Sequence, residues 1–140
     1  MDILSATDVR KNWSVTLDSV VRERPAYIKR TRDNIAIIGV ETLLDALAGY
    51  KFEADVFNEE DGSVTMSARV LDIVVNEADK KSAKSSLAKE ILEYAEDYYE
   101  HFHIWSSAPN RKGHIPYVLK ALSLDAKQIE EELVCRSGKI

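Results

Sequence analysis

The sequence is poor in the features that mark secreted, membrane-bound or zinc-cluster proteins. It has one cysteine, Cys135, among 140 residues, which excludes an internal disulfide and a metal site built from several cysteines. No apolar run approaches the roughly 20 residues that a bilayer-spanning helix needs. The first residues also lack the basic flank and apolar core of a signal peptide. We therefore expect a cytoplasmic protein that does not enter a membrane.

Motifs that carry catalysis are also missing. The sequence has no Gly-x-Ser-x-Gly elbow, no phosphate-binding loop and no His-Glu-x-x-His zinc motif. His101, His103 and His114 lie near Trp105, but no paired carboxylate or second cysteine accompanies them. We interpret these histidines as polar residues at a helix end, and we expect no enzyme activity, no cofactor and no bound metal.

The charge that is present is unevenly distributed. The net charge is −5, yet residues 1–50 carry seven basic and seven acidic side chains, and the whole deficit falls on the remaining ninety residues. All seven basic side chains lie within residues 10–32, against only two acidic ones, which gives a local charge of +5. A basic strip in an acidic protein favours a polyanionic partner on one face and a cationic partner on another. The alternative is that these are ordinary solvated charges.

The first fifty residues predict a strand, a helix, a hairpin and a second helix. Ser5 can cap the first helix, with Asp8 three residues later. We expect this helix to run to Arg22, before Pro25, with one apolar stripe formed by Val9, Trp13, Leu17, Val20 and Val21. The further predicted elements are a strand at 3–4, hairpin strands at 26–31 and 35–40 around a turn at 32–34, and a helix at 41–50.

The other ninety residues show a different pattern, and we place the domain boundary near Gly49-Tyr50, giving domains 1–50 and 51–140. Alternating apolar residues on both sides of Asp61-Gly62 predict a β-hairpin. Apolar residues at three- and four-residue spacings over 80–102 predict a long helix. We also expect a possible strand at 73–75, a loop at 109–113 and helices at 115–122 and 126–135, the second capped by Ser123 or Asp125 with Cys135 packed near its end. The predicted fold class is α+β.

A distinctive order of residues runs through the first third of the chain: Ser5-Ala6-Thr7, Arg10-Lys11-Asn12, Leu17, Val20, Pro25, Ile28, Arg30, Ala36-Ile37-Ile38 and Leu43 to Leu47. In this order the segment resembles the Phd/YefM (prevent-host-death) antitoxins of type II toxin–antitoxin systems. The resemblance implies a βαββα module that dimerises, binds palindromic operator DNA and represses its own operon. The sequence departs from the family pattern at Arg32-Asp33-Asn34, where a glycine and often a proline are usual.

The resemblance and the charge pattern indicate the same candidate DNA contacts. Arginine and lysine side chains can reach phosphates, and an arginine can contact guanine in a two-pronged way. A dimer doubles the contacts and gives the binding site twofold symmetry. The candidate residues are Arg10, Lys11, Asn12, Lys29, Arg30 and Arg32. Asn12 could read adenine, although asparagine is also common at exposed helix positions.

The second domain contains too many ordered segments to be the flexible tail that is usual in these antitoxins. Its hairpin and long tyrosine-rich helix faintly resemble the HicB-like antitoxin domain, although Asn76 to Asp79 replace the usual Gly-x-Thr helix entry. An acidic module suits the neutralisation of a basic toxin, typically a ribonuclease in such pairs. The candidate toxin contacts are Tyr99, Glu130 and Glu131. Tyr94, Tyr98 and Phe102 have the spacing of a core face, and the run of three glutamates at 130–132 is more typical of a solvated face than of a toxin contact.

These observations leave two functions open. In the first, the chain is an antitoxin that acts as a homodimer, or a higher oligomer, on operator DNA and binds a cognate toxin. In the second, it is a protein-interaction module with a Phd-like fold that does not contact DNA. An enzyme acting on nucleic acid would need clustered carboxylates or a His, Lys and Glu set, and none occurs at a recognisable spacing.

Overall fold

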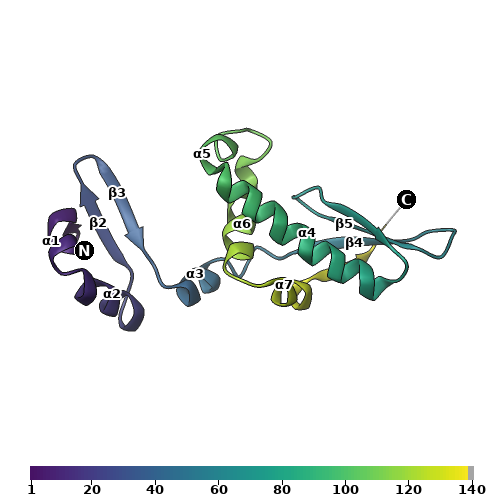
Figure 1. The fold of residues 1–140 in the computed structure, drawn as a ribbon, viewed down its shortest axis with the longest axis horizontal. Helices are drawn as coiled ribbons and strands as arrows, with labels where there is room; N and C mark the ends of the chain where they lie inside the picture. The colour runs from purple at the N-terminus through teal and green to yellow at the C-terminus, as the bar shows by residue number, and fades with distance from the viewer. Residues whose placement is uncertain (139–140) are drawn as a thin grey trace. The chain divides into compact units, whose positions relative to one another are not determined.

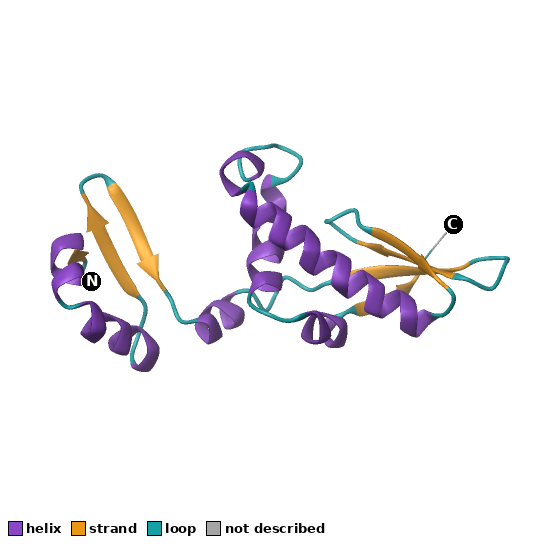
Figure 2. Cartoon of the chain, viewed as in Figure 1, coloured by secondary structure: helices purple, strands orange, loops and turns teal. Residues whose placement is uncertain are grey.

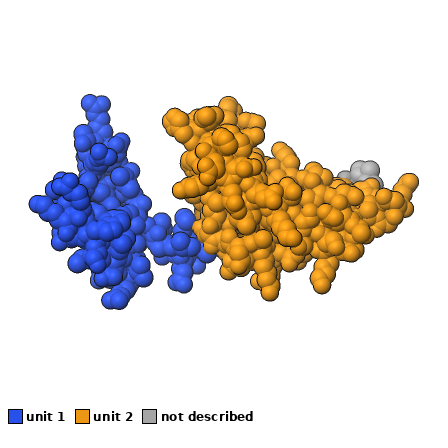
Figure 3. All heavy atoms as spheres, in the orientation of Figure 1, with its two compact units in different colours: residues 1–46 blue, residues 47–140 orange. Residues whose placement is uncertain are grey.

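The computed structural model describes residues 1–138 and divides the chain into two compact units (Figure 3). Unit 1 comprises Met1–Ala46 and unit 2 comprises Leu47–Ile140. The fold is mixed α+β, with one sheet in each unit. The final two residues of the expected second domain lie outside the described residues.

Unit 1 is a small three-stranded sheet with short helices. The strand order is β1-β2-β3, with β1 parallel to β2 and β2 antiparallel to β3. The elements are β1 (Leu4–Ser5), α1 (Ala6–Lys11), α2 (Trp13–Arg22), β2 (Ala26–Arg30), β3 (Asp33–Ile37) and α3 (Val40–Ala46). The Ser5 hydroxyl accepts a hydrogen bond from the Asp8 backbone N–H at 3.1 Å, which confirms the predicted helix cap.

The single helix expected up to Arg22 is wrong, because Asn12 divides it into α1 and α2. The Asn12 backbone has φ −118° and ψ 39°, outside the helical range. Its backbone N–H and its side-chain amide both donate to the Asp8 carbonyl oxygen, at 3.0 and 3.1 Å. An asparagine side chain competes with the backbone in this way and favours helix ends over helix interiors.

The interruption at Asn12 also changes which residues are buried. Val9 and Val20 are buried as expected, but Trp13, Leu17 and Val21 are exposed, and Thr16 is buried. A continuous helix would have kept the predicted apolar stripe on one face. The start of α2 at Trp13 therefore determines which of its side chains face the core.

The hairpin of unit 1 turns earlier in the chain than expected. Arg30 pairs with Asp33, so Thr31 and Arg32 form the loop, and Thr31 has a φ of 55°. A two-residue hairpin loop requires such left-handed backbone, which glycine adopts at the lowest cost. The predicted helix at 41–50 is shorter than expected, because α3 ends at Ala46.

Unit 2 is a four-stranded sheet with helices packed on it (Figures 1 and 2). The strand order is β6-β5-β4-β7, and β7 alone runs parallel to its neighbour, β4. The elements are β4 (Glu53–Asn58), β5 (Val64–Ala68), β6 (Val74–Glu77), α4 (Lys80–Glu100), α5 (Phe102–Trp105), η1 (Lys112–His114), α6 (Ile115–Leu122), α7 (Ala126–Glu132) and β7 (Val134–Ser137). The long helix α4 packs against β5, β6, α6 and α7.

The core of unit 2 lies between α4 and the sheet. Leu87, Ile91 and Tyr98 of α4 are almost completely buried, as the periodicity predicted. Gly62, with φ 87°, lies in the predicted hairpin turn between β4 and β5. Asp125 caps α7 in a complete capping box with Gln128, and α6 covers Ile115–Leu122 as expected.

The predicted helix at 126–135 is wrong at its end, because residues 134–137 form β7. Leu133 has extended backbone, and the Val134 N–H donates to the Phe52 carbonyl oxygen at 2.9 Å. Cys135 is therefore half-buried in a strand beside Ala54. This pairing joins segments about eighty residues apart, and a local spacing pattern does not contain that information.

Candidate nucleic-acid and partner surfaces

The six candidate DNA contacts of unit 1 are all exposed, and the structure places them in two groups. Arg10 and Lys11 form the last turn of α1, and Asn12 follows them. The second group lies at the β2–β3 hairpin, with Lys29 and Arg30 at the end of β2 and Arg32 in the loop. Within residues 1–138, none of these cations forms an ion pair.

The hairpin group does not form a single flat face. Successive side chains on a strand point to opposite faces, so Lys29 and Arg30 point away from each other. Arg30 shares its face with the buried Ile28, and Lys29 shares its face with the exposed Tyr27. The end of the hairpin therefore presents a cation on each of its two faces.

Asn12 has a structural role that limits what it can read. Its amide N–H already donates to the Asp8 carbonyl oxygen at 3.1 Å. This bond uses one of the two N–H donors of the amide and fixes the direction in which the side chain points. The geometry therefore assigns Asn12 a role in ending α1.

The strongest feature of unit 1 is the amount of apolar side chain that it leaves exposed. Its core cluster contains only Val9, Val20, Ala26 and Ile28. Eleven large hydrophobic side chains in the same unit are exposed: Met1, Ile3, Leu4, Trp13, Val15, Leu17, Val21, Tyr27, Ile35, Ile38 and Val40. Unit 1 therefore exposes more large apolar side chains than it buries.

The three candidate toxin contacts of unit 2 do not lie together. Tyr99 is 66% exposed near the C-terminal end of α4. Glu130 on α7 borders a groove near the other end of α4, and Glu131 is exposed beside it. At 1.5 Å per helical residue, Tyr99 lies about 21 Å along the helix from Ser85 in that groove. They therefore cannot form one small contact site.

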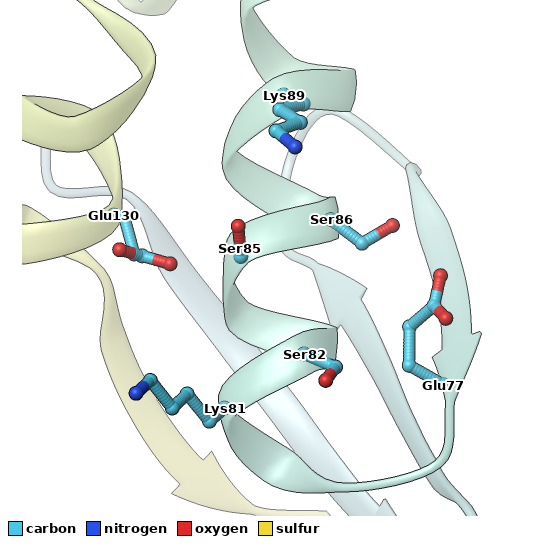
Figure 4. A pocket seen from close by; sticks show the side chains of 7 residues that line it. All are labelled: Glu77, Lys81, Ser82, Ser85, Ser86, Lys89 and Glu130. Carbon is cyan, nitrogen blue, oxygen red and sulfur yellow. The ribbon is translucent and has the colours of Figure 1, made fainter.

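The groove beside Glu130 has a volume of about 590 Å³ and a polar lining (Figure 4). Figure 4 shows Glu130 pointing from α7 toward α4, and Glu77 standing on β6 at the other side. Between them α4 contributes the rest of the lining: Lys81, Ser82, Ser85, Ser86 and Lys89. The three serine side chains are short, so they leave the groove open, and their hydroxyls can donate hydrogen bonds.

At the C-terminal end of α4 the structure assembles an aromatic cluster around Trp105. His101 stacks on Trp105 with ring centroids 5.0 Å apart, and the Arg111 guanidinium lies 3.7 Å from the Trp105 ring centroid. The His114 ring nitrogen and the Tyr94 hydroxyl are 2.7 Å apart. Burial raises the pKa of Tyr94 and Tyr98 above the usual value. The place of Arg111 in this cluster could not be predicted from the sequence, because the loop at 109–113 has no periodicity.

His101 and His114 accordingly have packing and hydrogen-bonding roles in this cluster. His101 and His103 are exposed, while His114 is buried against Tyr94. Among residues 1–138, no group of three or more histidine, cysteine, aspartate or glutamate side chains is placed to hold a metal ion. None of the described helices combines the length and the apolarity that a membrane crossing requires.

Two polar contacts in unit 2 were not expected from the sequence. Lys120 is 3% exposed, and its ammonium donates to the Tyr50 carbonyl oxygen at 3.0 Å and lies 3.6 Å from Glu132. Just after β5, Arg69 donates hydrogen bonds from Nε and Nη2 to both carboxylate oxygens of Asp55. The hydrogen bond from Arg69 lowers the pKa of the Asp55 carboxyl.

Comparison with known proteins gives a consistent result. Residues 1–135 match the model of the family described as PHD_like, antitoxin of toxin–antitoxin, RelE / RelB, TA system. A crystal structure from Syntrophomonas wolfei subsp. wolfei, titled "an antitoxin part of a putative toxin/antitoxin system", is 32% identical, with a TM-score of 0.91. The similarity covers 99% of this chain and 100% of that one. The search of curated proteins found no match.

Proposed function

We propose that this chain, which belongs to the antitoxin family and so has a cognate toxin as its partner, is also a dimeric repressor of its own operon. In this proposal unit 1 has the Phd/YefM role of dimerisation and operator binding, and unit 2 neutralises the toxin in the cytoplasm. The single observation that carries the proposal is the combination in unit 1 of a four-residue core, a large exposed apolar surface and six exposed candidate DNA contacts.

The exposed apolar residues support dimerisation through unit 1. A unit of 46 residues buries too little surface to be stable by itself, and most such units need a partner, a metal or a disulfide. Within its described residues this chain has one cysteine and no metal cluster. In this proposal a second copy therefore supplies the apolar contacts that unit 1 lacks. The exposed Trp13, Val15 and Val21 of α2 are the side chains that we expect to be buried on dimerisation.

The cations support DNA as the ligand of that dimer. The local charge of +5 in residues 10–32 becomes +10 when two copies associate. Each phosphate that a lysine or arginine neutralises releases counterions, so binding weakens as salt concentration rises. Twofold symmetry of the dimer predicts a palindromic operator with two half-sites.

Unit 2 carries the second half of the proposal. Its hairpin, third strand and long helix are consistent with the HicB-like resemblance, and its acidic charge suits a basic toxin, which we propose to be a ribonuclease. The exposed Tyr99 is the best anchor, because tyrosine contributes most where it is buried at the centre of an interface. We expect Tyr99→Ala to reduce recovery of the co-expressed neighbouring gene product in a pull-down and to reduce growth rescue.

The experiment that tests the DNA-binding role measures affinity for a duplex spanning the promoter of the chain's own operon. We expect Arg10→Ala and Arg30→Ala to weaken binding and to make the salt dependence shallower, by about one unit of log–log slope for each phosphate that the protein no longer neutralises. Lys127→Ala, which removes an exposed cation from unit 2, is the matched control and should change neither quantity.

A different outcome would favour the other candidate function. The exposed apolar surface of unit 1 is equally consistent with a protein-interaction module that does not contact DNA. In that case both arginine variants would bind the duplex as the unmodified chain does, and the affinity would not exceed that for a random duplex. Dimerisation would remain, but repression would not.

A further inference from the structure

Helix α4 has a charge arrangement that works against its own stability. Residues 79–89 carry four lysines and one aspartate, a charge of +3, while residues 90–100 carry five carboxylates, a charge of −5. The positive end of a helix dipole is the N-terminus and the negative end is the C-terminus, so both groups lie at the unfavourable end. The helix has no acidic residue in its first turn beyond the Asp79 cap and no basic residue in its last turn.

The exposed face of α4 is divided in the same way. The exposed Ser82 and Lys89 and the half-buried Ser85 and Ser86 form its N-terminal half, and all four line the groove shown in Figure 4. Glu93, Glu96, Asp97 and Glu100 form the C-terminal half and are all exposed. The first half offers hydrogen-bond donors, and the second half offers only acceptors when ionised.

The two halves are mirror images in sequence spacing about Ile91. Donors lie two, five, six and nine residues before it, and acceptors lie two, five, six and nine residues after it. Residues at these three- and four-residue spacings share one helix face, opposite the buried stripe of Leu87, Ile91 and Ala95. Two copies of this face laid antiparallel therefore place every donor beside an acceptor of the other copy.

From this self-complementary spacing we propose that α4 is a docking surface for α4 of a second copy of the chain, in antiparallel orientation with the twofold axis at the level of Ile91. The contacts in this dimer are Ser82 with Glu100, Ser85 with Asp97, Ser86 with Glu96 and Lys89 with Glu93 of the other copy. Each contact occurs twice, as twofold symmetry requires.

The proposed pairing also resolves the unfavourable charge placement. The carboxylates at the C-terminal end of one α4 come to the N-terminal, positive end of the other, where an anion is stabilised. Because the serine side chains in the groove are short, they leave room for the longer glutamate side chains to enter it. Glu77 and Glu130 border the groove, and against the +3 of residues 79–89 they leave its surroundings at +1, still opposite in sign to the incoming −5.

Polar contacts of this kind are individually weak in water, so this surface would act together with another link between copies. The proposed dimerisation of unit 1 would supply that link, but the α4 pairing is argued from unit 2 alone. Its failure would leave the DNA-binding proposal intact, because that proposal depends on unit 1.

The test uses disulfide formation in the full chain with Cys135→Ser. In the variant Ser82→Cys/Glu100→Cys, the two new cysteines are about 27 Å apart within one helix, too far for a bond that needs Cα atoms less than about 7 Å apart. A disulfide must then join two chains. We expect a covalent dimer in at least about tenfold higher yield than either single variant gives, because paired helices hold these positions together.

The register control is Ser82→Cys/Glu93→Cys, which places two cysteines on the same α4 face and removes one carboxylate as well. Positions 82 and 93 do not meet in the proposed antiparallel pair, so this variant should give only the yield of the single variants. Equal yields from the two double variants, or no dimer from either, would overturn the proposal.

A charge-exchange experiment separates pairing between chains from pairing within one helix. In the Ser82→Cys/Glu100→Cys background, Lys89→Glu and Glu93→Lys should each lower the dimer yield, because like charges then meet across the axis. Mixing the two variant chains should restore it, because each carboxylate at 89 meets a lysine at 93 of the other chain. A mixture that forms no more dimer than the separate chains would contradict the assigned contacts.

Discussion

Unit 1 and unit 2 differ most in how completely each buries its apolar side chains. Unit 2 packs sixteen buried residues into one core cluster and leaves six large hydrophobic side chains exposed, whereas unit 1 buries four and leaves eleven exposed. Burial of apolar surface is the main force that stabilises a fold. The difference indicates that unit 2 has the core of an independent domain and that the core of unit 1 is much smaller.

The largest effect that we expect from a single substitution falls in the core of unit 2. Leu87→Ala removes a fully buried side chain from α4 and should lower the free energy of unfolding by about 2–5 kcal/mol. Val74→Ala, at a side chain that is 62% exposed on β6, is the control and should cost much less. Denaturant unfolding followed by circular dichroism measures both variants, and a Leu87→Ala loss no larger than that of Val74→Ala would contradict a unit 2 stabilised by its core.

A smaller effect concerns the buried lysine of unit 2. Lys120→Met keeps an unbranched side chain of similar length but leaves the Tyr50 carbonyl oxygen without its donor, so we expect a loss of about 1–3 kcal/mol in unfolding free energy. Lys127→Met, at an exposed position of α7, should change stability by less than about 0.5 kcal/mol. Similar values for the two variants would mean that the hydrogen bond from Lys120 contributes nothing.

In unit 1 the hairpin loop offers a substitution that should stabilise. Thr31 has a left-handed backbone that is strained for a β-branched side chain. Thr31→Gly removes this strain but adds flexibility to the unfolded chain, so we expect a net gain of about 0.5 kcal/mol. Thermal unfolding measures the change. Thr31→Val, which keeps the branched shape, is the control and should give no gain.

The smallest effect is an acid sensitivity on the sheet of unit 2. The folded pKa of Asp55 lies below its unfolded value near 3.8, so its contribution to stability is present above that pH and is lost as the pH falls through the folded pKa. Between about pH 5 and pH 2.5, the unfolding free energy of the unmodified chain should therefore fall more steeply than that of Arg69→Met. If the unfolding free energy fell equally steeply in the two proteins, Arg69 would not be the cause of the acid sensitivity.

How much of the structure the sequence predicted depends on whether the information was local. The α4 stripe through Leu87, Ile91 and Tyr98, the Gly62 turn and the Asp125 cap were predicted, because helix periodicity, turns and caps depend on residues a few positions apart. The break at Asn12 was missed because a side chain bonded to the backbone outweighed the apolar spacing. The strand containing Cys135 was missed because its partner, Ala54, lies about eighty residues away.

The candidate sites follow the same rule. The basic strip was visible in the sequence as a local excess of charge, and the structure places its members in two exposed groups. The separation of Tyr99 from Glu130, and the positions of Arg111 and Lys120, depend on tertiary packing that no spacing revealed. The four-residue core of unit 1 could have been suspected from length alone, since about fifty residues bury little surface.

The proposed dependence of unit 1 on a second copy can be measured directly. Trp13 lies in unit 1, and Trp105→Phe leaves it as the only tryptophan, so its fluorescence reports that unit alone. A unit that needs a partner becomes more stable as protein concentration rises, by mass action. We predict that the denaturant midpoint of the Trp13 signal rises steadily over a hundredfold increase in protein concentration. A midpoint that stays constant over that range would contradict a unit 1 that is completed by its second copy.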